Sequence, residues 1–205
     1  FILRNNGAVG AKVYDLRLTS LAHTTRRVSG AKTFTSSTSS VVSNWAVERV
    51  WIDKVVVGLW MSGARNGVVR DCRIRDAHAD GINLNRGARD NLVENNHVRG
   101  TGDDAMAINS VNYNIFGSTT NYYTMMSNIR YVNNTAIAPW GGKCMGIYGG
   151  INDVVTNNLL RDTARYIGLG VGKFGVTGSD LLSATVIGNT VLRCGGNGYD
   201  QQQQA

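Results

Sequence analysis

Short apolar stretches alternate with polar turns along most of the chain, in a pattern that fits β-strands and lacks the three- and four-residue steps of helices. The segment from Val69 to Ile74 (VRDCRI) aligns with the segment from Val93 to Val98 (VENNHV). Ile82–Asn85 (INLN) aligns with Met106–Asn109 (MAIN), and both alignments have an offset of 24 residues. A strand-like repeat of this length is typical of a solenoid whose coils stack on one another.

A polar dipeptide between two apolar positions extends the repeat along the chain. It occurs as Asp71-Cys72, Asn95-Asn96, Asn133-Asn134, Asn157-Asn158 and Gly188-Asn189, at spacings of 24, 38, 24 and 31 residues. Asparagine tolerates left-handed backbone conformations, and stacked amides can hydrogen-bond from coil to coil. The sequence therefore predicts an all-β chain folded as a right-handed parallel β-helix. Two sets of residues test this prediction: Val69, Val93, Val155 and Val186 in one buried stack, and Asn96, Asn134 and Asn158 aligned at successive turns.

The long spacings indicate where coils carry insertions. The 38-residue coil holds the larger one, at about residues 110–128, and its Tyr, Asn and Thr content suits either sugar contact or a plain surface loop. A chain of 205 residues that opens at Phe1 without a methionine is interpreted as a fragment of a larger catalytic domain, folded as a single β-helix domain over residues 1–205.

Composition and charge narrow the classes of function. Hydrophobic residues make up 42% of the chain and charged residues 17%, which indicates a globular protein, and no apolar run is long enough to span a membrane. The net charge of +7 raises the alternative of a nucleic-acid binder. Because the Lys and Arg residues are scattered and accompany no recognition helix, a solvated basic surface on a monomer with no nucleic-acid partner is the preferred interpretation.

The three cysteines, Cys72, Cys144 and Cys194, lack the CxxC spacing of a metal site. Cys72 occupies a repeat position that elsewhere holds asparagine, so we expect it to be a packed turn residue. No metal site is predicted from these thiols.

The repeat also brings carboxylates together. Under the offset of 24, Asp80 falls on Asp104, with Asp103 beside it. Equivalent positions of stacked coils lie about 4.8 Å apart, and three carboxylates so close repel each other, which raises the proton affinity of at least one of them. Such a cluster favours acid–base chemistry or metal binding over chance surface aspartates. Glycoside hydrolysis needs one acid and one base, whereas a structural calcium ion is the competing use.

The motifs around these acids resemble a known family. Ala79–Ile82 (ADGI) and Gly102–Ile108 (GDDAMAI) look like the paired aspartate motifs of β-helical glycosidases of the polygalacturonase type. Where polygalacturonases carry Gly-His-Gly and Arg-Ile-Lys, this chain has Gly142–Gly146 (GKCMG) and Arg165–Gly168 (RYIG). Over nearly its whole length the sequence is closer to bacterial α-1,3-glucanases (mutanases) and their mycodextranase relatives.

This resemblance implies a secreted, extracellular hydrolase that needs no cofactor and cuts α-1,3-glucan of the mutan or nigeran type with inversion. It implies that Asp80, Asp103 and Asp104 are the catalytic set, with Asp103 as general acid and the other two activating water. Stacked carboxylates about 5 Å apart match the acid and nucleophile of a retaining enzyme, whereas the acid and base of an inverting enzyme lie about 6.5–9.5 Å apart. Asp80 and Asp104 are therefore assigned one shared role, the activation of water. The alternatives are another polysaccharide-active β-helix, such as a galacturonan hydrolase or a lyase, and a non-catalytic carbohydrate-binding β-helix.

Further residues are candidates for substrate contact, each with a plainer alternative. Lys143 and the pair Arg165-Tyr166 fall on or next to the repeat positions of Asp103 and Asp104 in later coils, where they could contact sugar hydroxyls or simply lie on the surface. A tryptophan could stack on a glucose ring or pack in the fold. The predicted substrate-binding residues are Trp60, His78, Lys143, Tyr148, Arg165 and Tyr166.

Overall fold

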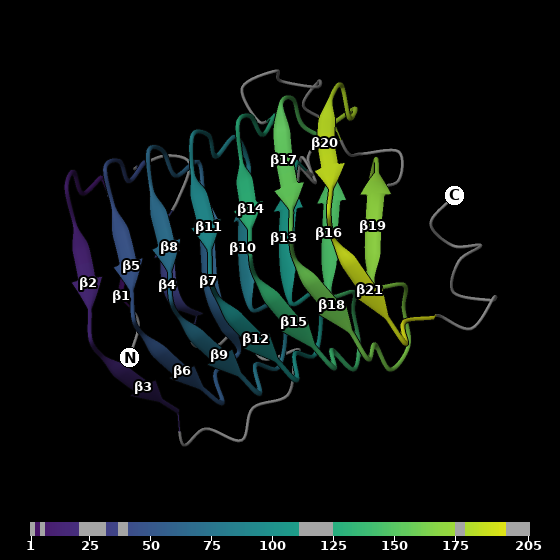
Figure 1. Ribbon diagram of the computed structural model, residues 1–205. Helices are drawn as coiled ribbons and strands as arrows, with labels where there is room; N and C mark the ends of the chain where they lie inside the picture. The colour runs from purple at the N-terminus through teal and green to yellow at the C-terminus, as the bar shows by residue number, and fades with distance from the viewer. Residues whose placement is uncertain are drawn as a thin grey trace, which may run out of the picture.

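The strands form three parallel sheets that wind into a β-helix (Figure 1). The computed structural model describes residues 3–4, 7–20, 32–36, 41–110, 125–174 and 179–195. The first sheet consists of β1 (Leu3–Arg4), β4 (Lys32–Ser36), β7 (Val57–Ser62), β10 (Ile82–Asn85), β13 (Met106–Asn109), β16 (Met145–Tyr148) and β19 (Leu169–Gly172).

The second and third sheets follow the same order of coils. The second consists of β2 (Lys12–Tyr14), β5 (Ala46–Glu48), β8 (Val68–Arg70), β11 (Leu92–Glu94), β14 (Arg130–Val132), β17 (Asp153–Thr156) and β20 (Ala184–Ile187). The third consists of β3 (Arg17–Thr19), β6 (Trp51–Asp53), β9 (Arg73–Arg75), β12 (His97–Arg99), β15 (Thr135–Ile137), β18 (Leu159–Arg161) and β21 (Thr190–Leu192). The predicted parallel β-helix is confirmed.

The register of the strands is the one that the repeat predicts. Ile82 pairs with Met106 in the first sheet, and Val69 pairs with Val93 in the second. Every side chain of the four-residue strand β10 is buried. Its alternate residues Ile82 and Leu84 belong to the hydrophobic core, so Asn83 and Asn85 lie on the outer face of the sheet. That outer face carries the candidate site.

The turn between the second and third sheets explains the recurring dipeptide. Its first residue has a left-handed φ near +55° at Asp71, Asn95, Asn133 and Asn157, a conformation that asparagine and aspartate tolerate better than most residues. The side chain of its second residue forms a ladder across the coils. The Oδ1 atom of Asn134, for example, accepts hydrogen bonds from the backbone N–H and the side-chain amide of Asn96, at 2.9 and 3.0 Å. The aligned asparagines are therefore confirmed.

Cys72 starts this ladder. Its thiol is buried, and its backbone N–H donates a 2.9 Å hydrogen bond to Oδ1 of Asn96. The expectation of a packed turn residue is confirmed.

The predicted valine stack is correct for three of its four members. Val69, Val93 and Val155 are buried, whereas Val186 is 37% exposed although it pairs in register with Val155. The prediction was wrong for Val186 because β20 is the last strand of its sheet in the described part of the chain, so no described coil covers its far side. Of the predicted insertion at 110–128, residues 111–124 lie outside the described residues.

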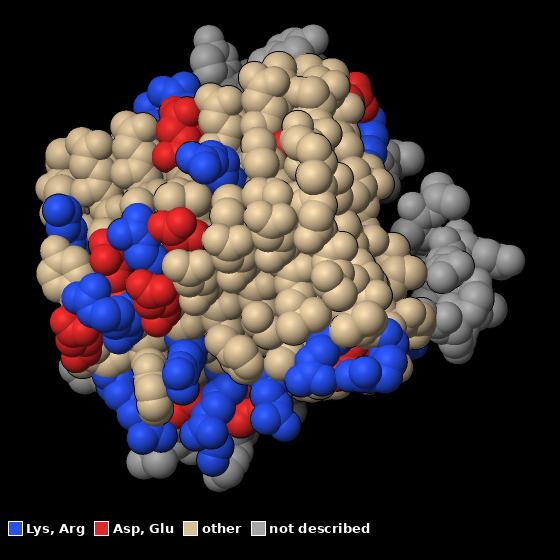
Figure 2. All heavy atoms as spheres, in the orientation of Figure 1, with Lys and Arg blue, Asp and Glu red and all other residues tan. Residues whose placement is uncertain are grey.

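The third sheet carries a basic outer face. The outer residues of β9 and β12 are exposed and include Arg73, Arg75 and Arg99. Figure 2 shows Lys and Arg side chains gathered along the lower part of the view, where the third sheet lies in Figure 1, with Asp and Glu among them. Within the described ranges there is no helix of the length and apolar content that a membrane crossing needs.

Candidate active site

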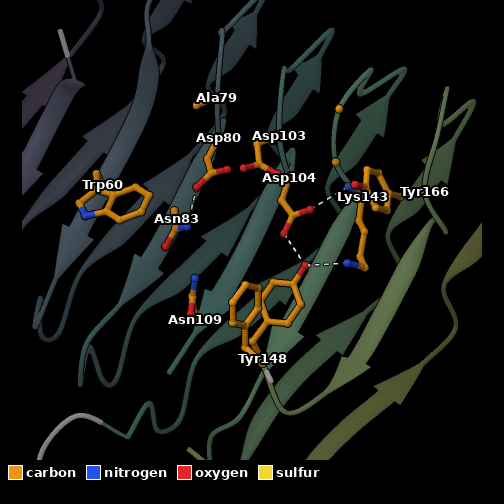
Figure 3. Close-up of a pocket in the computed structure, with 13 residues that line it drawn as sticks. Trp60, Ala79, Asp80, Asn83, Asp103, Asp104, Asn109, Lys143, Tyr148 and Tyr166 are labelled. Carbon is orange, nitrogen blue, oxygen red and sulfur yellow. Dashed lines mark hydrogen bonds between the residues drawn. The ribbon is translucent and has the colours of Figure 1, made fainter. Parts of the chain in front are cut away.

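A pocket of about 420 Å³ lies on the outer face of the first sheet. Its acidic and basic side chains come from the turns that lead into β10, β13 and β16, and its floor comes from those strands and β7. The residues that line it are Trp60, Ala79, Asp80, Asn83, Asp103, Asp104, Asn109, Gly141, Gly142, Lys143, Tyr148, Tyr166 and Phe174. Figure 3 shows most of these side chains converging on one volume.

Asp80, Asp104 and Lys143 occupy equivalent positions of three successive coils. The backbone N–H of Gly81 donates to the carbonyl of Asp104 at 3.1 Å, and that of Ala105 donates to the carbonyl of Lys143 at 2.9 Å. The alignment of Asp80 with Asp104 is therefore confirmed, as is the placement of Lys143 one coil later. The side chains of Asp80 and Asp104 are largely buried, at 6% and 7% exposure.

The three aspartates point in different directions within the pocket. The carboxyl groups of Asp80 and Asp103 point toward one another, whereas that of Asp104 points toward Tyr148 and Lys143 (Figure 3). The arrangement gives one pair of facing carboxylates and one carboxylate directed to hydrogen-bond donors.

Asp104 accepts hydrogen bonds on both of its oxygens. The backbone N–H of Lys143 donates to Oδ1 at 2.7 Å, and the hydroxyl of Tyr148 donates to Oδ2 at 2.6 Å. Burial raises the pKa of Tyr148 well above its ordinary value, and the nearby charge of Asp104 adds to this effect, so the hydroxyl keeps its proton. Hydrogen bonds to a carboxylate favour its ionised form.

Asp80 belongs to a second chain of polar contacts. The amide nitrogen of Asn83 donates to its Oδ2 at 2.6 Å, the amide of Asn85 donates to Oδ1 of Asn83 at 2.9 Å, and the hydroxyl of Ser62 donates to Oδ1 of Asn85 at 2.6 Å. Sequence reasoning missed the role of these asparagines. The sequence did hold a signal, since both asparagines alternate with the apolar Ile82 and Leu84 in a strand-like segment.

Glycines allow the turns that carry the acids to stack closely. A Cβ atom on Gly142 would lie 2.2 Å from the carbonyl carbon of Asp103, and one on Gly102 would lie 2.1 Å from the carbonyl oxygen of His78. Any larger residue at these positions would force the coils apart. The glycines beside the acids therefore have a packing function.

The predicted substrate-binding residues divide into two groups. Trp60, Lys143, Tyr148 and Tyr166 line the pocket, and Trp60 pairs in register with Asn83 on the neighbouring strand. His78 and Arg165 are not among the lining residues. The guanidinium of the exposed Arg165 lies over the ring of Tyr166, at 5.7 Å from its centroid.

Phe174 is a pocket residue that no sequence motif indicated. Its ring meets the ring of Tyr148 edge to face, with centroids 5.4 Å apart. It follows β19 outside any repeat position, so the alternation of strands gave no signal for it. Among the described residues, no group of three or more His, Cys, Asp and Glu side chains is arranged to hold a metal ion.

The fold matches solved catalytic domains of GH87 alpha-1,3-glucanases. The chain matches the catalytic domain of a GH87 alpha-1,3-glucanase variant in complex with tetrasaccharides, with a TM-score of 0.79 and 25% identity over 94% of this chain and 33% of that one. It matches the catalytic unit of the thermostable GH87 alpha-1,3-glucanase from Streptomyces thermodiastaticus with a TM-score of 0.65 and 26% identity, over 89% of this chain and 40% of the other.

More distant structures share the fold alone. An alginate lyase from Paenibacillus matches with a TM-score of 0.61 and 16% identity, over 97% of this chain and 70% of that one. No curated protein matches the chain by sequence.

The chain spans about one third of the length of the first of these GH87 catalytic domains. A family model for the alpha-1,3-glucanase catalytic domain D2 matches residues 5–204, which is nearly the whole chain. The chain therefore belongs to the alpha-1,3-glucanase catalytic domain D2 family.

Proposed function

We propose that this pocket hydrolyses α-1,3-glucosidic bonds of an extracellular glucan with inversion at the anomeric carbon. The observation that carries the proposal is the set of three aspartates that line one pocket, two facing each other and one held by two donors. Family membership supports the reaction class. Related GH87 catalytic domains are described in complex with tetrasaccharides and with nigerose, which supports an α-1,3-linked glucan as substrate.

The hydrogen bonds support separate roles for the aspartates. Asp80 and Asp104 each accept side-chain hydrogen bonds that favour the ionised form. Asp103 faces the Asp80 carboxylate, and the repulsion between them is relieved when Asp103 holds the proton. Asp103 is then the general acid that protonates the leaving glycosidic oxygen. Asp104, together with Asp80, orients a water molecule and takes its proton as the water attacks the anomeric carbon.

The direct test is release of reducing sugar from insoluble α-1,3-glucan by the purified chain. Replacement of Asp80, Asp103 or Asp104 by Asn is expected to lower turnover by about 10²–10⁴-fold, with circular dichroism spectra that match the wild type. A chelator is expected to leave the wild-type rate unchanged, because no metal takes part in the proposed steps.

The stereochemistry gives a second readout of the same assay. Proton NMR of the first-formed product is expected to show the β-anomer, as inversion requires. An initial α-anomer would mean retention and would make Asp80 or Asp104 a nucleophile. Binding of nigero-oligosaccharides without any hydrolysis would instead favour the carbohydrate-binding alternative.

A further inference from the structure

We propose that Tyr148 and Lys143 are positioning residues that hold the carboxylate of Asp104 in one orientation for its role as base, and that Gly146 and Gly170 make the space they need. This inference rests on the proposed hydrolysis. It assigns to Tyr148 and Lys143 a role through Asp104 in place of direct contact with the sugar.

The first observation is a relay of hydrogen bonds between buried groups. The ammonium of Lys143 donates to the hydroxyl oxygen of Tyr148 at 3.0 Å, and that hydroxyl donates to Oδ2 of Asp104 at 2.6 Å. Lys143 and Tyr148 are only 4% and 8% exposed. Because the ammonium has no acceptor lone pair, it fixes the direction of the relay, and the tyrosine proton points at Asp104.

The second observation is that Asp104 is bound at both ends of its carboxylate. The backbone N–H of Lys143 donates to Oδ1 while the hydroxyl of Tyr148 donates to Oδ2. Two donors from different directions fix the rotation of the carboxylate plane. A base with a fixed orientation loses little freedom when it takes up its proton.

The third observation is the absence of side chains beneath the relay. A Cβ atom on Gly146 would lie 2.4 Å from the ring of Tyr148, and one on Gly170 would lie 2.8 Å from the Cδ and Cε atoms of Lys143. Gly146 and Gly170 pair with each other on β16 and β19. The ring of Tyr148 therefore lies across the sheet over this gap and reaches Asp104, which comes from the preceding coil.

The fourth observation is that the cation is enclosed by aromatic rings. The ammonium of Lys143 lies 5.5 Å from the centroid of the Tyr166 ring, which is within the range of a cation–π interaction. It lies 5.1 Å from the centroid of the Tyr148 ring, at the edge that carries the hydroxyl to which it donates. The rings hold the ammonium beside the carboxylates, where its charge offsets part of their repulsion.

The test is the pH dependence of glucan hydrolysis by Tyr148→Phe, which keeps the ring and removes the donor. Loss of a hydrogen bond to the ionised base is expected to lower kcat by about 10- to 100-fold and to move the acidic limb of the pH–rate profile up by about one pH unit. KM is expected to stay within about twofold. Gly146→Ala displaces the ring and is expected to produce the same shift of the limb.

Gly172→Ala is the matched control. Gly172 pairs with Tyr148 on the adjacent strand, but a Cβ atom there would meet no described residue within 4 Å. Its kcat and pH profile are expected to equal those of the wild type.

Two outcomes would overturn the inference. A raised KM with an unshifted acidic limb in Tyr148→Phe would mean that Tyr148 binds the sugar directly. A wild-type profile in both Tyr148→Phe and Gly146→Ala would mean that the relay has no role in the reaction. Either result requires an active wild type, so failure of the proposed function itself is seen separately, as a wild-type chain that does not hydrolyse the glucan.

Discussion

At the scale of single residues, the surroundings of an aspartate determine its protonation. Asp104 is buried among donors, whereas Asp153 is buried with one of its oxygens unsatisfied. Oδ1 of Asp153 accepts the backbone N–H of Ile129 at 2.9 Å, but its Oδ2 has no hydrogen-bond partner among the described residues. Burial raises the pKa of Asp153 to about 7.

The coil repeat relates this unsatisfied oxygen to the side-chain amide nitrogen of an asparagine in an earlier coil. The register of the second sheet places Asp153 two coils after Asn91, with Ile129 between them. The amide nitrogen of Asn91 donates to the carbonyls of Ala64 and Arg89, at 2.8 and 2.9 Å. A carboxylate has no proton to donate at that position, whereas a protonated carboxyl group has one. The protonated form of Asp153 therefore fits the site of an asparagine.

Replacement of Asp153 by Asn is expected to make the fold less sensitive to pH. Because the folded-state pKa is raised from an ordinary value near 4, the stabilising contribution of the proton is complete below about pH 4 and is lost as the pH rises through 7. The wild type should lose on the order of 4 kcal/mol from this group over that interval. In urea unfolding, the free energy of unfolding of Asp153→Asn relative to that of the wild type should be higher at pH 8 than at pH 5.

Asp90→Asn provides the control for this comparison, because Asp90 is exposed and its carboxylate accepts an exposed hydrogen bond from the amide of Asn128. It should follow the wild type at both pH values. An advantage of Asp153→Asn that is equal at pH 5 and pH 8 would contradict the assignment of a raised pKa.

At the scale of the elements, the asparagine ladder adds side-chain hydrogen bonds between successive coils at the turn from the second to the third sheet. The amide of Asn134 donates to the carbonyl of Val93 at 2.9 Å and to Oδ1 of Asn158 at 3.0 Å, in addition to accepting from Asn96. Each inner asparagine thus satisfies backbone groups of the turn before it. The ladder substitutes for the hydrogen bonds that a β-sheet cannot make where the chain changes direction.

Asn134→Ala is expected to destabilise the fold by about 2–4 kcal/mol, because it leaves buried donors and acceptors of two neighbouring coils unpaired. Asn189→Ala, at the last described coil, removes a partner that is only half-buried, and water can replace part of what is lost. Its cost should be below about 1.5 kcal/mol. Equal losses in chemical denaturation would show that position in the ladder does not matter.

The ladder also explains which parts of the structure the sequence could predict. A left-handed turn followed by a buried amide tolerates few residue types, so the dipeptide recurs visibly and reveals the register of the coils. The same register aligned Asp80 with Asp104. The contact between Tyr148 and Asp104 left no such trace, because it depends on the missing side chain of Gly146 and on a ring that crosses between coils. Phe174 left no trace either, because it follows β19 outside any repeat position.

At the scale of the whole molecule, charge is distributed unevenly over the faces of the β-helix. The net charge is +7, and the outer face of the third sheet carries the exposed Arg73, Arg75 and Arg99, in the region where Figure 2 shows Lys and Arg side chains gathered. The pKa of His97 on that face is lowered, first by partial desolvation of its ring and then by the charges of Arg73, Arg99 and Arg161. The pocket on the first sheet, in contrast, contains three aspartates and one lysine. A polyanion is thus attracted to one face and repelled from the pocket on another.

This distribution predicts that neutral α-1,3-glucan is cut and that polygalacturonate is adsorbed without being cut. Attraction of the polyanion to exposed arginines is screened by salt, so its adsorption should weaken steeply between about 0.05 and 0.5 M NaCl while hydrolysis of the glucan changes little. Arg99→Ala should reduce adsorption of polygalacturonate and leave the glucan rate at the wild-type value, since Arg99 lies on the third sheet, away from the pocket. Measuring the reducing ends released from each polymer tests whether only the neutral glucan is cut. Comparable rates would mean that the carboxylates of the pocket do not select against a charged sugar, and a galacturonan hydrolase would then be the better assignment.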